Sequence, residues 1–418
     1  MPLLQSLESV QVHLAPIDES IRPISASGTL PPKRDAWGLF LIIAGSLGLG
    51  FGLLISAVLA IFSLFGQQPI ALGVEAAAFL ALGLLGAPAI YWGAKGSAKR
   101  AERKPDRVWV LALLLYPLAL FLGALAFEAG TLPRLLGPIA HILAAGAPVL
   151  FVVSVSLSRG PLLSARRRWA HFLAGLWVTP PLPLTIELIS LVPLGLLMIL
   201  GLALTPDGEA LFRELLAVEI GSEQQIELAT RLISQPIVIL LGVGMLSGVV
   251  PIIEELLKSL TIWPLLTRPM TSGQAFLGGT LGGAGYSLFE SLFLPQVGEE
   301  WVLTMVARGG TPLIHAFNAG LVCWGLAEGV RRKRWLLCAG TYILAVGLHG
   351  LWNLSAIGIG LSGLGLDLET GYLDPVLMST LGYLGLLGLL GLAVGSLAGL
   401  IWLPARLDAE GRARPRRT

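Results

Sequence analysis

The sequence has few charged residues and almost no cysteine. Asp, Glu, Lys and Arg make up 13% of its 418 residues, whereas hydrophobic residues make up 55%. Because a soluble domain needs a largely polar surface, this composition excludes a soluble fold and predicts a polytopic membrane protein. The two cysteines, Cys323 and Cys338, lie in apolar stretches without paired spacing, which argues against a disulfide framework or a thiolate metal site.

Motifs of several other function classes are also absent. The chain contains no Walker loop, no dinucleotide-binding fingerprint and no internal repeat, and we expect no nucleic-acid partner. Residues 1–36 are polar and contain proline, without the basic and apolar regions of a signal peptide. We therefore expect this segment to be a flexible tail and not part of a secreted precursor.

Long apolar stretches dominate the rest of the chain. About 20 residues of helix cross the hydrocarbon core of a bilayer, and ten stretches are long enough. The predicted fold is therefore an all-α, polytopic integral membrane protein with about ten transmembrane helices. The expected spans are residues 37–66, 70–94, 108–128, 137–158, 180–204, 236–266, 275–296, 309–330, 335–362 and 377–404.

The distribution of lysine and arginine predicts the orientation of these spans. An even number of spans places both termini on one side, and that side carries 23 of the 28 Lys and Arg residues. By the positive-inside rule it faces the cytoplasm, so we expect a multi-pass protein of the cell membrane with both termini cytoplasmic. The segments assigned to this side are residues 1–36, 95–107, 159–168, 267–274, 331–334 and 405–418.

Two connecting regions have distinctive patterns. Residues 205–235 alternate apolar and acidic residues at helical spacing, which predicts an amphipathic helix or helical pair at the outer face, either a structural cap or a substrate gate. The run "TPPLPL" at 179–184 should interrupt a continuous helix, because proline lacks an amide hydrogen. The fifth span is therefore expected to begin near residue 180.

Ionisable residues inside the spans are rare, since a charge at the bilayer centre costs about 2.5–3.5 kcal/mol on insertion scales. His141 lies near an outer helix end, where a local cap explains it, and Glu187 fits a packing, water-access or catalytic role. Glu254, Glu290, His315 and His349 lie 12–15 residues from the cytoplasmic ends of four consecutive spans, about 18–22 Å deep, which predicts one common site for the strongest candidates. These candidates are Glu254, Glu255, Lys258, Glu290, His315 and His349.

The local sequence around these residues favours a site that admits water. Pro251 should kink its helix one turn before Glu254, and "FLGGTLGGAGYSLFESLF" before and around Glu290 offers glycines for close helix packing. Asn353 follows His349 by four residues and shares its helix face.

Such a set of side chains suits hydrolysis by either of two routes. Two histidines and a carboxylate can hold a catalytic zinc ion, with a further glutamate as general base. Alternatively, a buried glutamate takes the proton of water without a metal, while histidines orient the water and an asparagine amide stabilises the oxyanion.

In order along the chain, "EELLK", "GYSLFE", "RGGTPLIHAFNAG" and "LHGLWN" resemble the motifs of the PrsW-type intramembrane proteases, within the wider group that includes the CAAX prenyl proteases. The resemblance covers about 169–362. It implies that Glu254 and Glu255 form the water-activating pair, and that His315, His349 and Glu290 complete the site. Tyr286 departs mildly from the phenylalanine more often found there.

Glu290 stands where the CAAX branch has histidine, which favours the PrsW side and argues against a prenylated substrate. The resemblance implies cleavage of a single-pass or hairpin membrane protein, such as an anti-sigma factor, within the lipid bilayer. The full set of candidates is then Glu254, Glu255, Lys258 and Asn353 as catalytic residues and His315, His349 and Glu290 as zinc ligands.

The chain therefore divides into a tail (1–36), four accessory helices (37–168), a catalytic core (169–362) and a last helix with a basic tail (363–418). The alternatives are an ion- or proton-coupled transporter with a Glu/Lys/His relay and a scaffold without activity. The absence of an inverted repeat, and the confinement of the polar groups to four consecutive spans, argue against the transporter. The oligomeric state stays open.

Overall fold

The computed structural model consists of helices throughout the residues that it describes. These are residues 36–65, 69–95, 107–128, 132–218, 224, 227–228, 231–232, 235–293, 298, 300–367 and 375–413. No strand occurs among them, and the predicted all-α class is confirmed. The predicted flexible tail, except for Ala36, lies outside the described residues.

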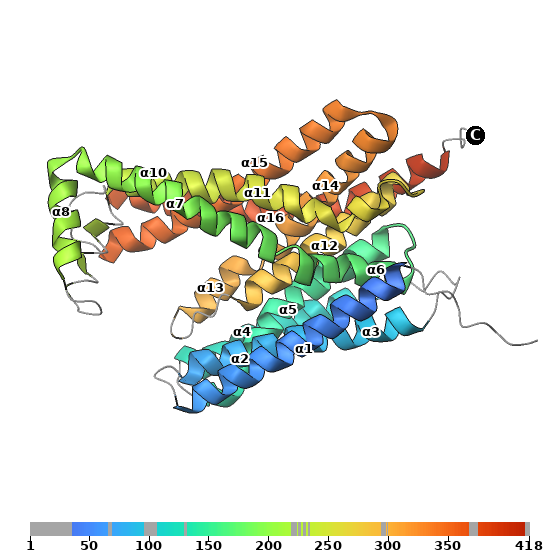
Figure 1. The fold of residues 1–418 in the computed structure, drawn as a ribbon, viewed down its shortest axis with the longest axis horizontal. Helices are drawn as coiled ribbons and strands as arrows, with labels where there is room; N and C mark the ends of the chain where they lie inside the picture. The colour runs from blue at the N-terminus through green and yellow to red at the C-terminus, as the bar shows by residue number, and fades with distance from the viewer. Residues whose placement is uncertain are drawn as a thin grey trace, which may run out of the picture. The chain divides into compact units, whose positions relative to one another are not determined.

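Figure 1 shows the helices in their order along the chain. Their bounds are α1 Ala36–Phe65, α2 Pro69–Leu84, α3 Gly86–Ala94, α4 Val108–Gly123, α5 Pro133–Arg159, α6 Ala165–Leu173, α7 Pro181–Ala203, α8 Pro206–Ala217, α10 Pro236–Gly244, α11 Val250–Lys258, α12 Ser272–Leu292, α13 Trp301–Arg308, α14 Thr311–Arg332, α15 Trp335–Asp367 and α16 Pro375–Ala413.

Within the described part of the chain, nine helical segments are long and apolar enough to cross a membrane. They are Ala36–Phe65, Ile70–Ala94, Val108–Phe127, Leu135–Arg159, Ala165–Ala203, Pro236–Thr261, Trp301–Arg332, Trp335–Ser362 and Val376–Ala409. The remaining predicted span, 275–296, is α12, which is rich in glycine and almost entirely buried. A helix that protein surrounds on all sides does not need the hydropathy of a helix that faces lipid.

Helix α12 packs against α14 and also against α5, α6 and α16. Glycines permit this close packing. A Cβ atom on Gly283 of α12 would overlap the carbonyl oxygen of His315, and a Cβ atom on Gly175, which precedes α7, would overlap the carbonyl oxygen of Gly282 in α12. The close approach at Gly283 sets the distance between α12 and α14. The predicted role of these glycines in helix packing is therefore confirmed.

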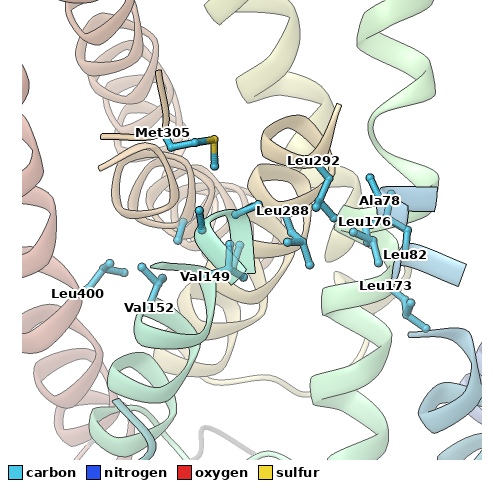
Figure 2. Packing of buried hydrophobic residues seen from close by; sticks show 14 of the residues in the cluster. Ala78, Leu82, Val149, Val152, Leu173, Leu176, Leu288, Leu292, Met305 and Leu400 are labelled. Carbon is cyan, nitrogen blue, oxygen red and sulfur yellow. The ribbon is translucent and has the colours of Figure 1, made fainter. Parts of the chain in front are cut away.

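The accessory helices share their core with the helices that follow. Helices α1, α2 and α3 lie side by side, as do α14, α15 and α16 (Figure 1). One buried apolar cluster contains residues from both sides of the predicted boundary at 168. It includes Ala78 and Leu82 from α2 and Leu288 and Leu292 from α12 (Figure 2). The sequence boundary at 168 therefore does not separate two cores.

His141 strengthens the same junction. The Trp301 indole Nε1–H donates to His141 Nδ1 at 3.3 Å, so the other ring nitrogen carries the proton and donates to the Leu292 carbonyl at 3.1 Å. The fully buried ring thus caps the Leu292 carbonyl at the end of α12, in agreement with the local cap expected at this position.

Helix α7 begins at Pro181, next to the expected start near 180. The chain before it is also helical, however, with α6 followed by a π-helical turn, Ala174–Val178. Part of the predicted amphipathic segment forms α8, where the Thr205 hydroxyl accepts a hydrogen bond from Gly208 N. Most of residues 219–234 lie outside the described residues.

Candidate functional site

Four helices bring the predicted polar residues together. Helix α11 contributes Glu254, Glu255 and Lys258, α12 contributes Glu290, α14 contributes His315 and α15 contributes His349. Ion pairs and hydrogen bonds connect all six side chains.

Lys258 lies at the centre of this network. Its Nζ atom is 2.8 Å from Glu254 Oε2, 2.8 Å from Glu255 Oε1 and 2.6 Å from His315 Nδ1. It also lies 4.5 Å from the centre of the Tyr286 ring, in cation–π contact. The side chain is 0% exposed, and burial of an ammonium group is tolerated because every donor has a partner.

The contacts of Lys258 determine the tautomer of His315. Because an ammonium group only donates, His315 Nδ1 must accept, and its proton therefore resides on Nε2. That nitrogen lies 2.9 Å from Glu290 Oε2, so the carboxylate faces the protonated side of the ring. Arg308 Nη2 lies 3.1 Å from the other oxygen of Glu290 and holds the carboxylate in place.

His349 has a matching arrangement. Its Nδ1 lies 2.8 Å from Glu255 Oε1, which fixes the proton on that nitrogen, because a carboxylate accepts. The lone pair of Nε2 is then available near Glu254 Oε2, 3.9 Å away. The two histidine rings lie 4.9 Å apart at 87°. Each histidine thus has one nitrogen beside a carboxylate, but only His349 has its other nitrogen free to accept, since His315 Nδ1 is bonded to Lys258.

The two adjacent glutamates differ in their surroundings. Glu255 is 0% exposed, and one of its oxygens contacts both Lys258 and His349. Glu254 is 6% exposed and lines a cavity of about 1050 Å³, together with Glu290, Tyr286 and Glu187. Of this pair, only Glu254 lines the cavity and can meet a molecule bound there.

The donor atoms that suit a metal ion lie close together. One donor atom each from Glu254, His315 and His349 lies within 4.8 Å of the others, all three residues being buried. These residue types match a catalytic zinc site. An ion bound there would require the ammonium group of Lys258 to move away from Glu254 and His315. Glu290, which was predicted as the third ligand, contacts His315 and Arg308 instead.

Asn353 has a hydrogen bond away from the charged network. The helix before α11 contains a π-helical turn, Met245–Val249, in which the Val250 amide donates to Met245 O. In this register the next donor, for Leu246 O, would be Pro251, which has no amide hydrogen. Asn353 Nδ2 donates to Leu246 O at 2.7 Å and takes the place of the missing donor. Its role as an oxyanion donor stays a prediction.

Two residues of the site were given no role by the sequence analysis, Arg308 and Trp177. Arg308 falls inside the quoted motif "RGGTPLIHAFNAG", but no helical spacing links it to Glu290, because the two lie on different helices. Trp177 lies in the π-helical turn before α7 and lines the cavity. The only signal for it is the adjacent proline run.

Comparison with known proteins supports the resemblance of the motifs. Residues 226–379 match the model of a family described as PrsW family intramembrane metalloprotease. The matched region contains the seven predicted site residues but not α1–α7, so Glu187 and Trp177 lie outside it. No curated protein and no solved structure matches the chain.

Proposed function

We propose that this multi-pass membrane protein, whose residues 226–379 match the PrsW family, is an endopeptidase that hydrolyses peptide bonds of membrane-protein substrates inside the bilayer. The observation that carries the proposal is the buried network around Lys258, from which Glu254 and Glu290 reach a large cavity. Buried ionisable groups in a membrane are costly and mark functional sites.

Each side chain of the network has a distinct role in this proposal. Glu254 faces the cavity and accepts a proton from a water molecule, whose oxygen attacks the carbonyl carbon of the peptide bond. The proton then passes to the nitrogen of the leaving amine as the C–N bond breaks. Glu255 and Glu290 orient the two histidines, and Lys258 offsets the negative charge of the carboxylates.

Zinc is the proposed cofactor, and His315 and His349 would hold it. Each of them has one ring nitrogen on an outer carboxylate, an arrangement common to histidine ligands. The third ligand is either Glu290, as the sequence pattern suggests, or Glu254, which lies near both histidines; Glu254 is the base only in the first case. When bound, zinc would supply a Lewis acid that polarises the peptide carbonyl.

The proposed location is the cell membrane, with both termini in the cytoplasm. The proposed substrate is a protein with one membrane span or a membrane hairpin, and an anti-sigma factor is one such class. The support for the orientation is the excess of Lys and Arg on one set of connections.

The activity can be tested in liposomes with tagged reporters that each contain one membrane-spanning segment. We expect the wild-type chain to cut at least one reporter within that segment, and Glu254→Gln and Glu255→Gln to lose cleavage. Glu209→Gln is the matched control, because Glu209 is exposed on α8 and pairs there with Arg213. Full cleavage by either of the first two variants would refute the paired-glutamate mechanism.

A further inference from the structure

The cavity next to Glu254 has walls from the accessory helices. Its lining includes Leu47 and Phe51 of α1, Trp177 and Leu184 from before and within α7, and Phe289 of α12, and the Trp177 ring contacts that of Phe51. Its volume of about 1050 Å³ exceeds the roughly 300–1,000 Å³ of typical small-molecule sites. The cavity therefore has room for a length of peptide chain.

The cavity opens between α1 and α7. Helix α1 packs on α2, α3 and α6, whereas α7 packs on α8, α10 and α11. The lining residues Leu47, Phe51 and Leu184 are each at least half exposed, so the opening faces the surroundings of the helices. A molecule within the membrane can thus reach Glu254 and Glu290 from the side.

Outside the network around Lys258, two polar atoms of the cavity-lining residues have no hydrogen-bond partner. Trp177 Nε1 and Glu187 Oε1 are both buried atoms without one, and both residues line the cavity. The indole nitrogen can only donate, whereas the carboxylate oxygen accepts. An acyl chain of a lipid offers neither group, but an unwound peptide offers one N–H and one C=O per residue.

We propose that the cavity binds an unwound stretch of the substrate's membrane-spanning segment, which enters between α1 and α7. On binding, the Trp177 side chain turns so that its Nε1–H, which lies against α1 at Gly48, donates to a backbone carbonyl of the substrate, and Glu187 accepts a backbone N–H. The apolar side chains of the segment pack on Leu47, Phe51 and Phe289. This inference rests on the proposed endopeptidase function and assigns substrate binding to helices outside the family match.

The physical need for such partners follows from the bilayer. A peptide bond inside a helix has its carbonyl hydrogen-bonded, so the helix must open locally before water can attack. In hydrocarbon the freed backbone groups have no water to bind and require partners in protein. Trp177 provides a donor and Glu187 an acceptor in the lining of the cavity that Glu254 also borders.

Gly48 on α1 offers a way to disturb this wall. A Cβ atom at Gly48 would lie 2.8 Å from Trp177 Nε1, whereas one at Gly50, two residues further on, would meet nothing within 4 Å. Gly48→Leu should therefore displace the indole and narrow the cavity. Gly50→Leu is the matched control on the same helix.

Photo-crosslinking tests where the substrate lies. A photoreactive amino acid replaces Leu47 or Leu54, which are 68% and 62% exposed on α1, but only Leu47 lines the cavity. In the Glu255→Gln background, we expect the tagged single-span reporters to crosslink at 47 and not at 54. Equal crosslinking at both positions, or none at 47, would overturn the proposal.

Kinetics with a reporter test the hydrogen-bonding residues. Trp177→Phe removes the donor but keeps an aromatic ring, and Glu187→Leu removes the acceptor. Each should raise KM about 2–10-fold, the effect of one hydrogen bond, with kcat unchanged. Gly48→Leu should raise KM further, while Gly50→Leu should not. Unchanged KM in both Trp177→Phe and Gly48→Leu, with folded protein, would contradict the proposed binding mode.

The two experiments separate this inference from the proposed function. Cleavage of a reporter without crosslinking at 47 would leave the endopeptidase intact and remove the cavity as its binding site. Crosslinking at 47 without cleavage by the wild-type chain would retain the binding site and remove the protease activity.

Discussion

Lys258 has the largest number of charged partners in the candidate site, because two carboxylates and one imidazole share its ammonium group. Removing one partner of a buried ion pair leaves the other charge without compensation, which costs about 3–5 kcal/mol. We expect Lys258→Met to lower the free energy of unfolding by this amount. The measurement is unfolding of the purified protein in detergent.

Lys333→Met provides the control for that prediction. Lys333 is exposed after α14, and surface substitutions usually change stability by no more than about 0.5 kcal/mol. An equal effect of the two variants would show that the buried network does not stabilise the fold.

Glu254 and Glu255 should contribute unequally to the stability of the protein, although both are needed for cleavage. One oxygen of Glu255 serves Lys258 and His349, and the side chain is fully buried, whereas Glu254 borders the cavity. Glu255→Gln should therefore lower the melting temperature more than Glu254→Gln. Thermal unfolding of both variants in the same detergent checks this order, and the reverse order would contradict the assigned surroundings.

The metal prediction also belongs to single side chains. His315→Ala and His349→Ala should each lose bound zinc together with activity, and a chelator should inhibit the wild-type chain reversibly. Loss of a carboxylate that only orients a histidine lowers metal affinity about 10–100-fold. Glu255→Gln should therefore lower zinc affinity by this smaller factor.

Comparison of Glu254→Gln with Glu290→Gln then identifies the third ligand. Of these two variants, the one in which the ligand is replaced should bind less zinc. Active wild-type protein that contains far less zinc than protein would remove the metal from the mechanism. His315 and His349 would then orient water.

Sequence reasoning found these residues because ionisable groups are rare in apolar spans, so each could be weighed by itself. Helical spacing then placed Glu254 beside Lys258, and the structure has this contact. Spacing carries no information about contacts between helices, which is why the pair of Arg308 with Glu290 was not foreseen. The neighbours of Trp177 depend on the same unpredicted packing.

At the scale of elements, the π-helical turn before α11 links a proline to a distant asparagine. Asn353→Ala would leave Leu246 O without a donor, at a cost of about 1–3 kcal/mol. Pro251→Ala would restore an amide hydrogen next to that carbonyl. We therefore expect the double variant to be more stable than Asn353→Ala alone, as measured by thermal unfolding.

Activity of the same variants separates two roles of Asn353. If the side chain only supports the turn, Pro251→Ala should restore cleavage along with stability. If it also stabilises the oxyanion, the double variant should be stable but impaired. A double variant no more stable than Asn353→Ala would contradict the explanation of the turn.

Helix existence was easier to predict than helix environment. Most of the expected spans match single helices to within a few residues, because about 20 apolar residues suffice to identify a span. Helix α12 is helical where expected, but its burial on nearly every side follows from glycine contacts with α14 that no local pattern specifies. Likewise, the helical turns before Pro181 rest on tertiary packing.

At the scale of the whole molecule, the orientation of the chain is open to a direct test. Cys323 is buried but Cys338 is only half-buried, so the background should carry Cys338→Ser. In intact cells, a membrane-impermeant thiol reagent should label Ala210→Cys on α8. It should label Lys333→Cys only after permeabilisation. The opposite pattern would invert the proposed topology.

The charges on α11 also have a consequence for biosynthesis. Each charge at the bilayer centre costs about 2.5–3.5 kcal/mol, and Lys258 offsets part of this cost within its own helix through Glu254 and Glu255. The remaining partners are translated later: His315 follows Lys258 by 57 residues, and His349 follows Glu255 by 94. Helix α11 must therefore stay beside water or the insertion machinery until α14 and α15 have left the ribosome.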